Sequence, residues 1–208
     1  MILNERLSNS LFIVNRSSLI NIMEIGTVLY PRTRQEWRDW LMENHATGTD
    51  IWLRTPHKAS GMDRVSYDDC IEEALCFGWV DGLTKSYDNS SSVRRYTPRR
   101  KKTFLSELNR QRMFKMIEMS LMTDAGISPV KDQLGSPDDP LVIPDDMLIQ
   151  LQLDEEVWKN WQNFPLVYRK IRVGYIKEML QKHPKIAQKR IDNLLKKTAD
   201  NKMYGTMV

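Results

Sequence analysis

The chain has 208 residues, of which 31 are Lys or Arg and 27 are Asp or Glu, so its formal net charge is +4. This excess is too small to imply a protein that binds polyanions through bulk charge, and two cysteines exclude a small domain held together by disulfides. No apolar run approaches the roughly 18–20 residues that a membrane-spanning helix needs.

The first 25 residues lack the pattern of a secretory signal. Glu5 precedes the apolar part and Arg16 splits it, whereas a signal peptide needs a basic start and an unbroken apolar stretch. Two interpretations remain, an amphipathic targeting segment and a translated upstream extension with Met23 as the natural start, and the second is favoured. We expect residues 1–25 to be a poorly ordered extension and the protein to be cytoplasmic.

We expect Cys70 and Cys76 to be buried, unreactive thiols, which fits a cytoplasmic protein. Six residues of a helix turn through about 600°, so the two side chains point to different faces and cannot pair locally. No C-x-x-C motif is present, and His45, His57 and His183 are the only histidines. We therefore expect no metal site and no cofactor.

The pattern of residues 26–122 predicts an α+β domain, a small antiparallel sheet with packed helices. Thr33 and Glu36 form a capping box, Ser66 caps a second helix, and Gly78 is placed to end it. Pro98 closes a hairpin around the polar turn 88–92. In chain order we expect a strand at 25–30, a helix at 33–44, a strand at 51–53, a helix at 66–77, strands at 79–85 and 93–97, and a helix at 103–121.

Apolar residues at helical spacing identify the sides of these three helices that should be buried. They are Trp37, Trp40 and Leu41 in the first; Tyr67, Cys70, Ile71, Ala74 and Leu75 in the second; and Leu105, Leu108, Met113, Met116, Ile117 and Leu121 in the third.

Residues 123–144 carry six prolines and glycines and predict a linker, and residues 145–202 predict an all-helical region. Trp158, Trp161 and Phe164 share one helical face, and Pro165 and Pro184 each begin a further helix. The side chains expected to be buried in those two helices are Tyr168, Ile171, Tyr175, Ile176, Met179, Leu180, Ala187, Ile191, Leu194 and Leu195.

Several segments, taken in order, resemble the YdeI/OmpD-associated family, whose members are also called bacteriocin-protection proteins. The segments are Glu36-Trp37-Arg38, Asn44-His45-Ala46-Thr47, Ile51-Trp52-Leu53, the run EALCFGWVDG at 73–82, Arg95-Tyr96-Thr97-Pro98-Arg99-Arg100, Phe164-Pro165, Tyr168-Arg169-Lys170 and Lys189-Arg190-Ile191. The resemblance spans residues 28–200, and the run at 73–82 is its most specific part.

This resemblance implies a small bacterial or archaeal α+β protein without an established reaction. The family name implies association with an outer-membrane porin and protection against bacteriocins or cationic antimicrobial peptides.

Charge is concentrated in blocks of one sign. Residues 85–115 hold ten bases and two acids, and residues 159–202 hold twelve bases and three acids. Residues 36–81 hold ten acids and four bases, and residues 132–156 hold eight acids and no base. One interpretation is that these blocks pair with each other inside the protein, at about 0–1 kcal/mol per exposed pair. The other is a basic cleft for a phosphorylated ligand or a nucleic acid, since Arg binds phosphate oxygens in bidentate fashion.

The most distinctive local motif is Gly78-Trp79-Val80-Asp81-Gly82, in which two glycines flank a Trp and an Asp. It is either a glycine helix stop with Trp79 in the core, or one wall of an anion-binding pocket floored by Trp79. In such a pocket Asp81 would orient an arginine or accept a proton from a ligand hydroxyl. The basic run at 99–102 precedes a predicted helix start, where N–H donors would add positive potential. The residues predicted to bind ligand are Trp79, Asp81, Lys85, Arg95, Arg99 and Arg100.

Three functional hypotheses follow. The first is a non-catalytic accessory protein with a basic pocket, whose partner is an anionic small molecule or a protein. The second is nucleic-acid binding through blocks 85–115 and 159–202, without a recognised motif. The third is an enzyme acting on a small phosphorylated metabolite, although no P-loop, G-x-G-x-x-G or G-x-S-x-G motif marks a catalytic residue. The sequence leaves the oligomeric state open.

Overall fold

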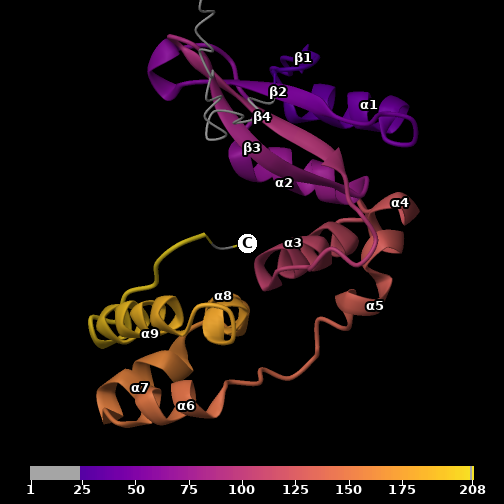
Figure 1. Ribbon diagram of the computed structural model, residues 1–208. Coiled ribbons are helices and arrows are strands. Elements are labelled where there is room, and N and C mark those ends of the chain that lie inside the picture. The colour runs from indigo at the N-terminus through magenta and orange to yellow at the C-terminus, as the bar shows by residue number, and fades with distance from the viewer. Residues whose placement is uncertain (1–23, 207) are drawn as a thin grey trace, which may run out of the picture.

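The computed structural model describes residues 24–206 and 208 (Figure 1). Its sheet has the order β1-β2-β4-β3, from β1 (Val28–Leu29), β2 (Ile51–Pro56), β4 (Ser91–Pro98) and β3 (Trp79–Asp88). The α+β class is therefore confirmed, and nearly all of the predicted extension 1–25 lies outside the described residues.

The sheet is mixed rather than wholly antiparallel. Strands β2, β4 and β3 pair antiparallel, whereas β1 runs parallel to β2. Helix α1 (Arg34–Asn44) lies between β1 and β2 in the chain and carries it back to the starting edge, so the two strands run in the same direction. A two-residue strand gives too little pattern for the sequence to reveal this pairing.

Helices α1 and α2 (Tyr67–Cys76) pack on one face of the sheet (Figure 1). Both predicted N-caps are confirmed: the Thr33 hydroxyl accepts from the Glu36 amide at 3.2 Å, and the Ser66 hydroxyl accepts from the Asp69 amide at 3.1 Å. The Glu36 carboxylate accepts from the Arg32 amide, one residue before the position that the capping box predicts. The core of this domain includes Trp37, Leu41, Ile51, Leu53, Cys70, Ile71, Ala74, Leu75, Trp79 and Tyr96.

Three details of this domain differ from those predicted from the sequence. Tyr67 is 50% exposed because it is the first residue of α2 and lies at the edge of the sheet beneath Arg94. Helix α3 (Glu107–Glu118) begins four residues later than expected, since the Ser106 hydroxyl caps it by accepting from the Asn109 amide. Ile117 is 40% exposed, whereas Met113 and Met116 are buried as predicted.

The segment predicted as a linker contains short helical elements. They are α4 (Asp124–Ile127), η3 (Ser128–Val130) and α5 (Lys131–Leu134), and Val130 and Leu134 belong to the core of the sheet domain. Residues 135–144 then run without helix or strand to the C-terminal region.

That region consists of α6 (Asp145–Gln152), α7 (Glu155–Asn163), α8 (Leu166–Leu180) and α9 (Pro184–Ala199), as an all-helical prediction requires. Its separate core includes Trp161, Phe164, Tyr168, Ile176, Ile191 and Leu194. Tyr175 is exposed, contrary to prediction. Helix α8 packs on α3 (Figure 1) with Gly174 against Glu107, where any side chain at position 174 would collide with the glutamate Cβ. Among the described residues, no helix has the length and apolarity to cross a membrane.

Two glycines with similar backbone conformations allow a test of the close packing of Gly78 against Ala125. Gly78 has a φ of +73° and a Cβ there would collide with the Ala125 carbonyl, whereas Gly61 has a φ of +67° and faces open space. We predict that Gly61→Ala costs about 1 kcal/mol, the strain of a left-handed residue. Gly78→Ala should cost a further 1–3 kcal/mol or so from overpacking. Scanning calorimetry would show the Gly78 variant melting several degrees below the Gly61 variant, and equal midpoints would contradict this packing.

Candidate functional site

The structure divides the six predicted ligand-binding residues between the two faces of the sheet. Because side chains alternate along a strand, Trp79 and Asp81 lie on the face that α1 and α2 cover, and Arg95 lies with Lys85 on the opposite face. Trp79 is 1% exposed and its Nε1 donates to the His45 carbonyl at 3.2 Å. Trp79 therefore packs as core and does not floor a pocket.

Asp81 is engaged by side chains that the sequence did not single out. Its Oδ2 accepts from Arg94 Nη1 at 2.8 Å and from the Tyr67 hydroxyl at 3.2 Å. The Arg94 guanidinium also lies over the Tyr67 ring, 4.7 Å from its centroid. Burial, and then the negative charge of Asp81, raise the pKa of Tyr67. Asp81 does orient an arginine, but the arginine is Arg94, and this geometry gives no support to the enzyme hypothesis.

Arg99 has a structural role. It is 8% exposed, and its Nη1 donates to the carbonyls of Thr103 at 3.4 Å and Phe104 at 3.2 Å. Burial lowers the pKa of Arg99. Its guanidinium thus holds the turn between β4 and α3.

Arg95 and Arg100 meet in a groove of about 350 Å³ on the side of the sheet opposite α1 and α2. Arg95 Nε donates to Asp50 at 2.8 Å, whereas Arg100 is exposed and makes no ion pair with any described residue. Lys85 lies farther along the hairpin, with its ammonium 5.4 Å from the Trp52 ring centroid. The remaining residues that line the groove are Thr49, Val80, Thr97, Pro98 and Thr103.

The three threonines of this groove were not among the residues predicted from the sequence to bind ligand. Thr97 could have been found, because it is two residues from Arg95 on β4 and so shares its face. Thr49 precedes β2 and comes near Arg95 only through the pairing of β2 with β4, which no local pattern reveals.

Half of the ten bases in block 85–115 form ion pairs with acids among the described residues, in the way that the first interpretation of the charge blocks predicts. Four of its bases pair with acids from block 36–81, and Arg110 pairs with Glu107 and Asp139. The four pairs are Arg94–Asp81, Arg95–Asp50, Arg112–Asp68 and Lys115–Glu72.

The second basic block keeps its charge. Of its twelve bases, Lys202 alone forms an ion pair within the described part of the chain, with Asp200 at 3.8 Å. The exposed lysines on α7, α8, α9 and the turn between the last two are Lys159, Lys177, Lys182, Lys185, Lys189 and Lys196. These exposed lysines of the helical region thus form no ion pair among the described residues, whereas half of the bases in block 85–115 are paired within the protein.

Both cysteines are buried and unpaired, as expected. Burial raises the pKa of the Cys70 thiol to about 12 and that of the Cys76 thiol to about 11. Among the residues described, no cluster of three His, Cys, Asp or Glu side chains is arranged to hold a metal ion.

The ion pairs around Glu73 generate a prediction about stability. Glu73 is 1% exposed and accepts from Arg34 and, at 2.7 Å, from Arg38. Glu73→Ala should lower the free energy of unfolding by about 3 kcal/mol, the low end for a broken buried pair because both arginines keep access to water. Glu43→Ala, an exposed position on the same helix as Arg34 and Arg38, should change it by less than about 0.5 kcal/mol. Unfolding in urea, which does not screen charge, measures both, and equal costs would refute the role given to Glu73.

Comparison with known families divides the chain at the same place as the two cores. Residues 29–129 match a family described as a domain of unknown function (DUF8412). Residues 140–201 match the family described as bacteriocin-protection, YdeI or OmpD-associated. No curated protein and no solved structure matches the chain.

The second match is to the family that the sequence motifs resemble, and it confirms that resemblance for the helical region, residues 140–201. The motif at 73–82, the most specific part of the resemblance, lies in the segment that matches the other family. The chain thus joins a segment that matches a domain of unknown function to a helical C-terminal segment that matches the bacteriocin-protection, YdeI or OmpD-associated family.

Proposed function

We propose that this protein is a non-catalytic accessory protein that binds a phosphate-bearing small molecule in the groove of Arg95 and Arg100. One observation carries the proposal: Arg100 lies in a groove with a second arginine and three threonines, and no carboxylate of the described residues pairs with it.

The chemistry of the groove suits a phosphate. Arg has five N–H donors in a planar fork, so Arg95 retains donors for a ligand while its Nε holds Asp50. Asp50 fixes the orientation of that guanidinium and partly offsets its charge. Hydroxyls of Thr49, Thr97 and Thr103 can donate to the remaining phosphate oxygens.

The groove also limits the size of the ligand. Its volume of about 350 Å³ is at the small end of ligand pockets, which range over roughly 300–1,000 Å³. Val80 and Pro98 give an apolar contact for the organic part of a phosphorylated compound. The protective role in the family's name would then depend on such binding.

The first test is the variant Arg100→Ala. We expect it to weaken binding of pyrophosphate, nucleotides or phosphosugars by at least about tenfold, because a charged hydrogen bond contributes roughly 1.5–3 kcal/mol. Arg64→Ala is the matched control: it removes the same charge from another exposed position with no ion pair among the described residues. A calorimetric titration of wild type and both variants measures the effect.

Fold loss would not complicate this test, since Arg100 is exposed and pairs with no acid among the described residues. Equal affinities in wild type and Arg100→Ala would reject the groove as the site. A wild-type protein that binds none of these phosphates would reject the proposed function itself.

A second candidate function is nucleic-acid binding, and the unpaired lysines of the helical region favour it. Lys185 and Lys189 are four residues apart on α9, so they lie on one exposed face. Binding through such lysines releases counterions, and the affinity then falls steeply with salt. The groove proposal needs none of these residues, so the two candidates can be separated.

We expect Lys185→Gln/Lys189→Gln to reduce the slope of log affinity against log salt by about 1.4–1.8 for DNA. The double variant Lys58→Gln/Lys131→Gln removes the same charge from exposed positions on the sheet domain and should leave the slope unchanged. Fluorescence anisotropy with labelled single- and double-stranded DNA measures both. An equal loss in the two double variants would indicate bulk charge only, and an absence of binding would exclude this candidate.

A further inference from the structure

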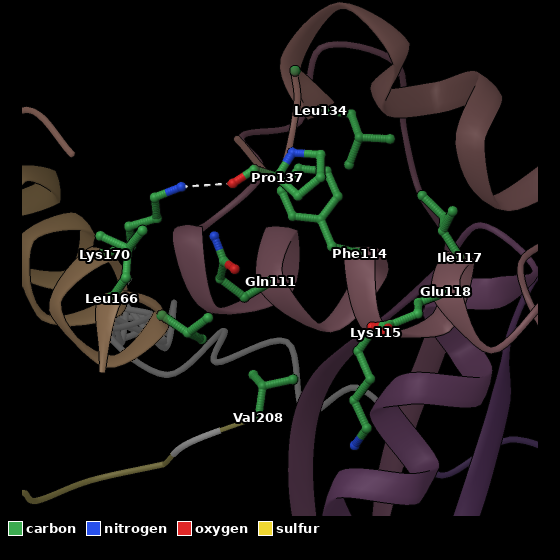
Figure 2. A pocket seen from close by; sticks show the side chains of 12 residues that line it. Gln111, Phe114, Lys115, Ile117, Glu118, Leu134, Pro137, Leu166, Lys170 and Val208 are labelled. Atoms are coloured by element: carbon green, nitrogen blue, oxygen red, sulfur yellow. Dashed lines mark hydrogen bonds between the residues drawn. The ribbon is translucent and has the colours of Figure 1, made fainter. Parts of the chain in front are cut away.

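A cleft of about 620 Å³ lies between α3 and α8, where the sheet domain meets the helical region (Figure 2). Phe114, Ile117 and Leu134 line one side, and Leu166 and Lys170 of α8 line the other. The volume lies within the range of small-molecule sites, which occur preferentially between domains. None of the six ligand-binding residues predicted from the sequence belongs to its lining.

Lys170 is the unusual side chain in this cleft. It is 4% exposed, and its Nζ donates to the Pro137 carbonyl at 2.8 Å (Figure 2). An ammonium has three N–H donors, and a buried charge is costly unless an anion compensates it. Within the described residues no carboxylate lies within ion-pair distance of Lys170. The nearby Asp139 is bound by Arg110 at 2.9 Å.

The other charged groups at the cleft indicate what charge its occupant carries. Lys115 is already paired with Glu72 at 2.9 Å, and Glu118 is exposed at the rim. Lys170 is therefore the cation whose charge an anionic ligand would compensate. The negative charge of Glu118 disfavours a ligand with a second negative charge. Phe114, Ile117, Leu134 and Leu166 offer an apolar surface beside it. The site thus combines one buried positive charge with an apolar wall.

We propose that the cleft binds a small amphipathic monocarboxylate, with its carboxylate on Lys170 and its apolar body against Phe114 and Leu166. Phe114 lies in the segment that matches the domain of unknown function, and Lys170 lies in the segment that matches the YdeI or OmpD-associated family. The ligand would therefore bridge the two parts of the chain. This site is separate from the phosphate groove.

The test uses the full chain with octanoate and with octanol, which has the same alkyl length without the charge. Octanoate should bind wild type saturably, and Lys170→Met should weaken it at least about tenfold, because a charge-assisted hydrogen bond is lost. Octanol should bind wild type and Lys170→Met equally. Lys159→Met, an exposed position on α7, is the matched control and should leave octanoate affinity unchanged.

Val167→Trp gives a second measurement that does not depend on the buried lysine. Val167 lines the cleft and is 40% exposed, so a larger side chain can block the cleft without entering the core. It should abolish binding of octanoate and octanol together. Wild type without saturable octanoate binding, or octanoate affinity unchanged in Lys170→Met or in Val167→Trp, would overturn the proposal. Pyrophosphate binding should be the same in wild type and Lys170→Met, which separates this proposal from the phosphate groove.

Discussion

The acidic face of α2 is the feature on which the rest of the structure depends. Glu72 and Glu73 are 4% and 1% exposed, and they accept from Arg34 and Arg38 of α1 and from Lys115 of α3. Two buried carboxylates without these cations would be strongly unfavourable. Three helices, α1, α2 and α3, are thereby tied together.

This network and the other ion pairs of the sheet domain divide the cations of the described residues into paired and unpaired groups. The block 85–115 looks like a binding surface in the sequence, but Arg94, Arg112 and Lys115 are held by acids of the same domain. Arg100 remains accessible, next to Arg95 in a threonine-lined groove. The helical region has exposed lysines on its surface, and its buried Lys170 lines the cleft between the two halves. The protein thus has three chemically different surfaces: the groove of Arg95 and Arg100, the exposed lysines of the helical region, and the cleft at Lys170.

The local elements could be predicted from the sequence because they depend on neighbours in the chain. The Thr33 and Ser66 caps and the Gly78 helix stop each need only a few consecutive residues. The grouping of the site could not be predicted, since it depends on which face of the sheet each side chain takes. The register shift between Asp81 and Thr84 and the pairing of Trp52 with Arg95 set those faces. For this reason Asp81 meets Arg94, and Arg95 meets Asp50.

The most direct measurement is an NMR titration of the isotope-labelled full chain with pyrophosphate, followed through its backbone amides. If the accessible cations are those of the groove, the amides of Thr49, Thr97 and Arg100 shift in a saturable way, and those of Asp68 and Glu72 do not. Shifts confined to α9, or shifts at Asp68 and Glu72 that show the internal pairs opening for the anion, would contradict this division of the charges.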